Sequence, residues 1–295
     1  MSQLGKRQRS IGSYGNYSIG SLFGFGKTRG TRKFKPKPLM AKGKLATMMR
    51  VIAKREIEKT TELKTATDTS EIIDLPNFAN SNTNNNVIPL VPDSSALTIT
   101  QGTAASQRIG NEIRVKRVYL HYSLFPKPYN ATSNSVPIPQ DVICYIFSLR
   151  ANESSQLSAV QTFCRTSFFD AGGSVQGFSG DLSDFMKRPN TDAVIVHKRF
   201  MLKLGAANYE TNSGTQANNF SYSNNDYKLN CIRRMDITKY IPKNIKFEDS
   251  STVIQNNPVY LVMSPCDCDG GAAADTTAAI PVTYSYGLTY EFTDK

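Results

Sequence analysis

The first 55 residues of the chain, which we call the arm, hold 14 basic side chains and no acidic ones. The whole chain has 35 Lys and Arg and 24 Asp and Glu, so the remainder, the body, has 21 basic and 24 acidic residues and a net charge of −3. Lys and Arg at this density bind a polyanion by releasing its condensed counterions. We therefore expect the arm to neutralise the phosphates of a nucleic acid. The candidate nucleic-acid-binding residues are all the basic residues of the arm: Lys6, Arg7, Arg9, Lys27, Arg29, Arg32, Lys33, Lys35, Lys37, Lys42, Lys44, Arg50, Lys54 and Arg55.

Aromatic rings lie between these charges, at Tyr14, Tyr17, Phe23, Phe25 and Phe34. Ring faces stack on unpaired bases without regard to sequence, which favours single-stranded over duplex nucleic acid. The alternative interpretation is a solvated tail that keeps the protein soluble or directs it to the nucleus. Both functions are compatible, because the same basic residues can act at different stages.

The arm has few large aliphatic side chains before Leu39, so it cannot bury enough apolar surface to offset its chain entropy. We expect it to be disordered up to Pro38. Apolar residues at helical spacing then predict a short basic helix over residues 41–58. Two short basic clusters, Lys6–Arg9 and Thr31–Lys37, are similar to nuclear import signals and predict import receptors as partners.

The pattern of chemically reactive residues does not favour an enzyme. His121 and His197 each lie within an alternating segment, where a satisfied or surface imidazole is the usual finding. Gly26–Thr28 looks like the end of a phosphate-binding loop, but the glycine required five residues earlier is replaced by Ser21. We expect no catalytic residue and no cofactor.

The five cysteines are not arranged as paired C-x-x-C units, which favours reduced thiols in a cytosolic or nuclear setting. Cys266–Asp269 lacks the partners that zinc needs, so we expect no metal site, with calcium bound between subunits by its two Asp as the alternative. We expect no secretory signal and no membrane insertion. The longest apolar run, Val142–Phe147, is far shorter than the about 20 residues of a membrane-spanning helix.

The body has the alternating pattern of β-strands. The alternation of Leu63, Thr65, Thr67 and Thr69 with polar neighbours predicts a half-buried strand. Further strands are expected, joined by long loops over Asn77–Asp93, Pro126–Gln140, Gly172–Arg188 and Ala206–Asn225, and no body segment has sustained helical periodicity. The other predicted strands are Arg108–Phe125, Val142–Leu149, Ala193–Leu204, Ile232–Ile241, Pro258–Met263 and Val282–Phe292.

Two of these strands carry further detail. Within Arg108–Phe125 the apolar phase changes near Lys116, which predicts a β-bulge because a strand has a period of two. Within Val282–Phe292, Val, Tyr, Leu and Phe share one face and Thr, Ser, Gly and Glu share the other. The body is therefore predicted to be an all-β, two-sheet antiparallel sandwich.

The order of features resembles the capsid proteins of small circular single-stranded DNA viruses of the circovirus and nanovirus kind, in the Rep-encoding group. The matching pieces after the basic arm are Glu62–Lys64, Ile99–Gly102 running into Gln107–Lys116, Val194–Leu204, Arg233–Ile237 and Pro258–Met263. The most specific of them is Gln107–Lys116.

This resemblance implies an eight-stranded jelly roll over residues 56–295, an interior arm over 1–55 bound to the viral genome, and nuclear import. It also implies an icosahedral shell of about 60 copies, found in the virion and assembled in the host nucleus. The arm departs from the family pattern. It is richer in Gly, Tyr and Phe than the dense arginine runs of circovirus arms.

Other interpretations remain open. The arm's composition leaves open a small RNA virus capsid. A cellular nucleic-acid-binding β-domain protein predicts a second basic surface on the body, drawn from Arg114, Lys116, Arg117, Lys198, Arg199, Arg233 and Arg234. A carbohydrate-binding or receptor-binding sandwich would use the long loops and leaves the arm unexplained.

Overall fold

The computed structural model describes residues 47–53, 62–78, 85–92, 97–128, 137–150, 157–208, 220–249, 251–267 and 280–295. By its internal contacts the chain divides into two units, Met1–Arg55 and Glu56–Lys295. In the first unit, residues 47–53 are helical, within the predicted helix over 41–58. The rest of that prediction, and the disorder predicted up to Pro38, lie outside the described residues.

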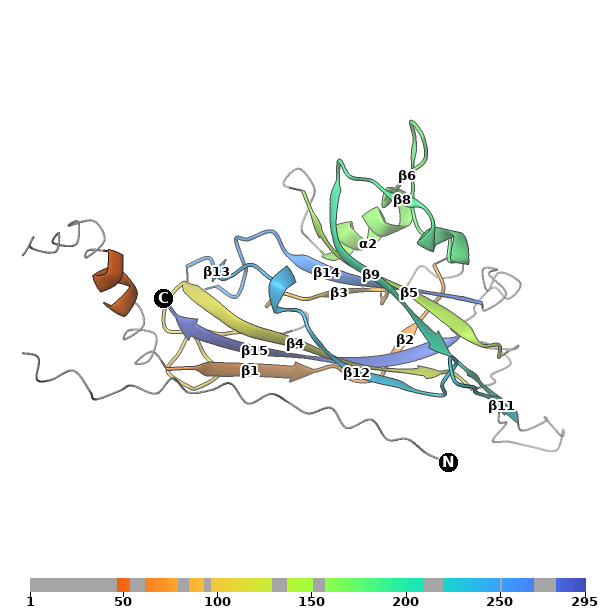
Figure 1. Ribbon diagram of the computed structural model, residues 1–295, viewed down its shortest axis with the longest axis horizontal. Coiled ribbons are helices and arrows are strands. Elements are labelled where there is room, and N and C mark those ends of the chain that lie inside the picture. Colours follow the sequence, from red (N-terminus) through yellow and green to blue (C-terminus); the bar gives the residue numbers. More distant parts are fainter. Residues whose placement is uncertain are drawn as a thin grey trace, which may run out of the picture. The chain divides into compact units, whose positions relative to one another are not determined.

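The second unit is built on two antiparallel sheets (Figure 1). The first sheet has the order β1 (Lys64–Thr69), β15 (Val282–Asp294), β4 (Glu112–Pro126) and β12 (Cys231–Asp236), with β2 (Ile73–Leu75) beside β15 and β13 (Asn244–Lys246) beside β4. The second sheet has the order β3 (Val87–Pro89), β14 (Val259–Asp267), β5 (Gln140–Leu149) and β9 (Val194–Leu204).

The connectivity of these strands is that of a jelly roll. Numbered along the chain, the eight principal strands run 1-8-3-6 in the first sheet and 2-7-4-5 in the second. Strands far apart in the sequence, such as β1 and β15, are therefore neighbours. The predicted all-β jelly-roll sandwich is confirmed.

The core lies between the two sheets. Val118, Leu120 and Leu124 of β4 belong to the same buried cluster as Cys144 and Ile146 of β5. Residues that alternate with these on β4, such as Tyr119 and His121, face away from the core. Because side chains alternate along a strand, every second residue of β4 enters the core and the residues between them lie on the outer face of the sheet.

The predicted bulge in β4 is confirmed. Glu291 of β15 pairs with Arg117, and the next residue, Phe292, pairs with Val115, so Lys116 is the extra residue. The bulge keeps Val115 and Val118 buried although three positions separate them. The two predicted faces of β15 are confirmed as well, with Val282, Leu288 and Tyr290 buried.

The predicted phase of β1 is wrong. Lys64 and Ala66 are buried, whereas Leu63 is 56% exposed. The pattern is misleading because a lysine is expected to face solvent, whereas the buried Lys64 ammonium is paired with the Asp294 carboxylate and hydrogen-bonded to the Gln107 carbonyl oxygen. The predicted strand Ile232–Ile241 is also too long, since β12 ends at Asp236 and is followed by a 3-10 turn, Thr238–Tyr240.

An insertion between β5 and β9 holds a helix that was not predicted, α2 (Leu157–Thr166). Val160 and Cys164 of this helix pack with Phe168 and Phe169 in a second buried cluster, on the face of the second sheet opposite the main core. Figure 1 shows α2 beside β9 and β5. The helix has ten residues, and only three of them are buried. Its helical periodicity in the sequence is therefore too weak to distinguish it from a polar loop.

Several predicted loops contain short strands. The insertion holds β6 (Phe169–Asp170), β7 (Val175–Gln176), β8 (Arg188–Pro189) and a 3-10 turn, Leu182–Phe185. β3 lies in the predicted loop Asn77–Asp93, and β10 (Ala206–Asn208) pairs with β11 (Phe220–Tyr222) in the predicted loop Ala206–Asn225. No helix among the described residues is long and apolar enough to cross a membrane.

Candidate nucleic-acid interface

The predicted nucleic-acid-binding residues lie almost wholly outside the described residues. Only Arg50 is described, on the helix over residues 47–53, and its side chain is exposed. The other 13 predicted residues lie outside the described residues. What it describes is the sheet into which the chain continues from the arm, beginning at β1.

The first residue of β1 is held by a buried ion pair. The Lys64 ammonium lies 2.8 Å from Asp294 Oδ2 at the end of β15 and donates a hydrogen bond to the Gln107 carbonyl oxygen (2.8 Å). The other oxygen of the Asp294 carboxylate accepts a hydrogen bond from the Ile109 backbone N–H (3.0 Å). This cluster joins β1, the C-terminal strand and the loop that carries Gln107.

The neighbouring Arg108 is fully buried and is also held internally. Its guanidinium donates to Asn111 Oδ1 (3.1 Å), to the Gly110 carbonyl and to the Ser251 carbonyl (2.5 Å), and lies 4.4 Å from the centre of the Phe247 ring. Burial lowers the pKa of Arg108, while the nearby carboxylate of Asp294 acts in the opposite direction. Both cations, Lys64 and Arg108, are thus positioned to hold the fold and not to contact phosphate.

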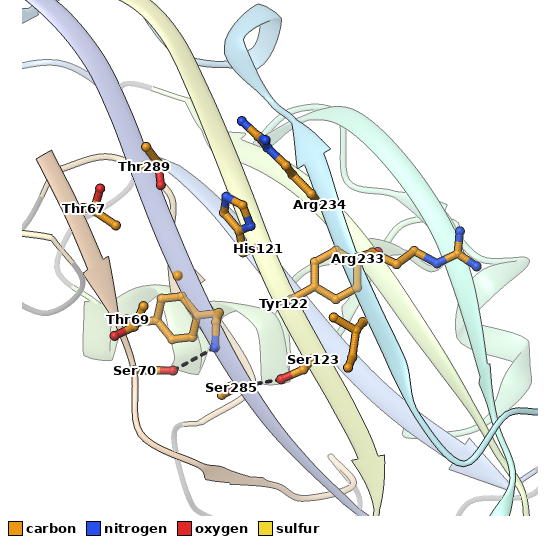
Figure 2. Close-up of a pocket in the computed structure, with 13 residues that line it drawn as sticks. Thr67, Thr69, Ser70, His121, Tyr122, Ser123, Arg233, Arg234, Ser285 and Thr289 are labelled. Atoms are coloured by element: carbon orange, nitrogen blue, oxygen red, sulfur yellow. Dashed lines mark hydrogen bonds between the residues drawn. The ribbon is translucent and has the colours of Figure 1, made fainter. Parts of the chain in front are cut away.

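A hollow lies on the outer face of the first sheet, the face away from the core (Figure 2). It measures about 550 Å³ and is lined by residues of β1, β4, β12 and β15. None of the 13 lining residues is Asp or Glu. Six carry hydroxyl groups on small side chains: Thr67, Thr69, Ser70, Ser123, Ser285 and Thr289.

The register of the strands explains the floor of the hollow. Gly287 of β15 pairs with His121 on one side and with Thr69 on the other, so the middle of the face has no side chain. A Cβ atom at this position would lie 3.0 Å from the Asp68 carbonyl oxygen and 3.1 Å from Thr69 Cγ2. The glycine therefore both allows β1 to approach and leaves the hollow open.

Cationic side chains lie at the β12 side of the hollow. The Arg234 guanidinium lies 3.9 Å from the centre of the Tyr119 ring, a cation–π contact. Arg234 pairs with His121 across the strands, and Figure 2 shows both on the side of the hollow. Arg233 has the opposite phase, and in Figure 2 its guanidinium extends away, past β12.

One carboxylate, Asp236, lies close to this surface. Its side chain accepts a hydrogen bond from the Thr238 backbone N–H (2.9 Å). The Thr238 hydrogen bonds lower the pKa of Asp236, and Arg117 and Arg234 lower it further. Asp236 is therefore ionised at neutral pH and already has partners.

The seven basic residues proposed as a second surface do not form one cluster. Arg117 and Arg234 both act on Asp236, at the outer face of the first sheet. Arg199 belongs to β9 in the second sheet, where it donates to the Phe185 carbonyl oxygen (3.2 Å). Lys198 is also on β9, and its ammonium lies 3.6 Å from Met235 Sδ.

His197 and the described cysteines are placed as structural residues, whereas His121 lines the hollow. His197 Nε2 lies 3.1 Å from Ser148 Oγ, and burial lowers its pKa. The four described cysteines, Cys144, Cys164, Cys231 and Cys266, are buried and free of disulfides. Across the described part of the chain, no group of three or more His, Cys, Asp or Glu could hold a metal ion, and Cys268 and Asp269 lie outside it.

Sequence reasoning predicted the polar face of β15, and it named His121 as an ordinary imidazole and Arg234 as one of seven basic residues. It did not place them beside Tyr119 on one surface, because the pairing of strands far apart in the sequence brings them together. The one available signal was a glycine in the centre of an otherwise regular strand. No model of a known protein family matches the chain, and no curated protein matches it.

Proposed function

We propose that the chain is a viral capsid protein. Its jelly-roll body would assemble into an icosahedral shell and its arm would package single-stranded nucleic acid, in line with the resemblance to circular DNA viruses. One observation carries the proposal: 14 basic residues and no acidic ones precede a jelly-roll body of net charge −3. Jelly rolls occur in capsids but also in lectins and cupins, so the fold alone is not decisive. No catalytic role is assigned.

The charge distribution supplies the mechanism. A body close to neutral can pack against copies of itself with little repulsion, while the arms meet the packaged strand. About 60 arms would provide on the order of 800 positive charges, a large share of the phosphates in a genome of a few thousand nucleotides. Binding of this kind carries no sequence code and weakens steeply with salt.

Exposed apolar side chains on the body support self-association. In the insertion, Met186 is 85% exposed and Val175 is 51% exposed. Exposed apolar side chains close together in the chain would be buried if this insertion lies in a contact between copies. We expect the long loops between strands to supply much of the contact between copies.

Deletion of residues 1–55 tests the packaging role. We expect the truncated protein to keep the β spectrum of the body and to lose nucleic-acid retention. A full-length variant with all 14 basic residues of the arm replaced by Gln keeps the aromatic rings and separates charge from stacking. Equal retention by the truncated and complete proteins at matched salt would overturn the packaging role of the arm.

Nuclear import is a separate proposal for the same segment. Replacing Arg32, Lys33, Lys35 and Lys37 with Ala should leave a tagged protein cytoplasmic, because import receptors recognise such basic clusters. The matched control is the same number of Ala substitutions outside both basic clusters, at Lys27, Arg29, Lys42 and Lys44. Continued nuclear accumulation of the first variant would contradict this signal.

A cellular nucleic-acid-binding β-domain protein is the second candidate. The acid-free hollow with Arg234 at its side favours it, because that class needs a binding surface on the body itself. It predicts a monomer or small oligomer, whereas a capsid protein predicts large particles. Digestion of extracted nucleic acid with DNase and RNase distinguishes the DNA virus from the RNA virus alternative.

A further inference from the structure

We propose that the hollow on the outer face of the first sheet is a second contact site for single-stranded nucleic acid, made by the folded body. A phosphate of the strand would lie beside Arg234 and His121, and its sugar or base over the floor at Gly287. The inference deepens the proposed function, since it assigns a folded site to the ligand proposed for the arm.

The charge of the surface favours an anion. The lining includes Arg234 and His121 and no carboxylate. Within 4.0 Å, Arg234 makes no ion pair with any residue that the structure describes, and its guanidinium lies over the Tyr119 ring. Its charge also acts on Asp236, a carboxylate outside the lining that already has Thr238 and Arg117 as partners. The guanidinium is therefore held in place by a ring and still presents its charge, the arrangement expected of a phosphate contact.

The size and the polar groups favour a nucleotide over a bare ion. A hollow of about 550 Å³ lies within the roughly 300–1,000 Å³ range of small-ligand sites. The Ser and Thr hydroxyls can donate to phosphate or sugar oxygens. The Ser123 and Ser285 hydroxyl oxygens already lie 2.6 Å apart, which fixes their positions on the floor.

Binding would not depend on base identity. The stacked pair of Tyr119 and Arg234 offers a flat surface with a fixed cation, which any base can contact through its π-face. This agrees with the arm, whose charges and rings also carry no sequence code. One surface of the body would thus extend a contact that the arm begins.

The connection between the arm and β1 gives a thermodynamic reason for nucleic acid to bind in the hollow. β1 follows the arm in the sequence and supplies Thr67 and Thr69 to the hollow. A strand held by the arm is tethered to the protein, so its contact with the hollow is an intramolecular step that even a weak site can make.

Photo-crosslinking of the full-length protein to a halogenated oligothymidylate, followed by peptide mapping, tests the site. We expect crosslinks on Tyr119 or His121 in addition to those on the arm. Arg234→Gln should reduce the body crosslinks about tenfold. It should also make the slope of log K against log salt concentration shallower by about 0.7, the value for the loss of one phosphate contact on a single strand. Arg188→Gln, an exposed arginine on β8, should leave both unchanged.

A second pair of variants separates charge from shape. Thr289→Glu places a carboxylate in the hollow and should abolish the body crosslinks, because the carboxylate repels a phosphate. Thr289→Gln introduces a side chain of the same size as Glu without the charge and should reduce the crosslinks less. Thermal unfolding of each variant checks that the body is intact. Arg234→Lys keeps the charge without the planar stack and should give intermediate crosslinking.

The other occupants are outcomes of the same experiment. Crosslinks confined to the arm, unchanged by Arg234→Gln, would overturn the site and leave arm-driven packaging intact. A change in particle size with unchanged crosslinks would mean that the face binds a second copy of the chain. Equal competition by a neutral glycan would indicate a carbohydrate site. A complete protein that binds no oligonucleotide would overturn both proposals.

Discussion

The buried ion pair at the start of β1 gives the sharpest prediction about the fold. Asp294→Asn keeps the shape of the side chain and the hydrogen bond from the Ile109 N–H, but removes the charge that faces Lys64. The Lys64 side chain is 2% exposed, and its remaining described acceptor would be the Gln107 carbonyl oxygen. An ammonium without its counter-charge would then be buried.

The magnitude follows from the exposure of the two partners. Breaking a buried pair costs about 3–5 kcal/mol. Asp294 is 20% exposed, so water screens part of this interaction, and we expect a loss of about 2–3 kcal/mol for Asp294→Asn. Lys64→Met should cost less, because the Asp294 carboxylate that remains is reached by water and keeps the Ile109 N–H.

Urea unfolding of the unassembled protein measures these differences. The double variant Lys64→Met/Asp294→Asn should be more stable than Asp294→Asn alone, because it removes the unpaired ammonium as well. Lys295→Met is the control, since its ammonium lies 2.5 Å from Glu112 Oε1 but is half exposed, and an exposed pair contributes about 0–1 kcal/mol. Equal losses in Asp294→Asn and Lys295→Met, or strictly additive losses in the double variant, would refute the reasoning.

Three further predictions test other parts of the body. Gly287→Val should lower the free energy of unfolding by about 1–3 kcal/mol, because its side chain would press on the Asp68 carbonyl oxygen; unchanged urea unfolding would contradict the packing at the floor of the hollow. Burial raises the pKa of Asp141 above its usual 3.8, so the folded state is penalised once this carboxylate ionises. Asp141→Asn should therefore stabilise the protein at pH 7, and the gain should vanish as the pH falls below 3.8, as followed by urea unfolding at a series of pH values. A lower stability of Asp141→Asn than of the unchanged protein at pH 7 would contradict this prediction. Burial also raises the pKa of the Cys144 and Cys164 thiols, and that of Cys266 to about 12. The four described cysteines are all buried, so they should resist alkylation in the native protein, and mass spectrometry showing more than one modified thiol per chain would contradict their burial.

The sequence was sufficient for the features that depend on local periodicity. The phase change near Lys116 predicted the bulge, and the regular alternation of β15 predicted its two faces. Both signals are strong because one residue in two must enter the core. The same rule failed for β1, where the buried Lys64 depends on Asp294, a partner more than 200 residues away.

The hollow could not be predicted, because it depends on register between strands. Thr69, Gly287, His121 and Arg234 form one row across four strands that are far apart in the sequence. No spacing within any one strand reveals this row. The helix α2 was missed for a different reason, since its apolar side contacts a cluster that exists only when the insertion folds onto the second sheet.

The mass and nucleic-acid content of the purified full-length protein test the central proposal most directly. Light scattering at low salt, combined with the ratio of absorbance at the nucleic-acid and protein maxima, reports both properties on one sample. A capsid protein predicts megadalton particles that contain single-stranded nucleic acid and release it as salt rises. A 32.6 kDa monomer without nucleic acid, even in dilute buffer, would contradict the proposal.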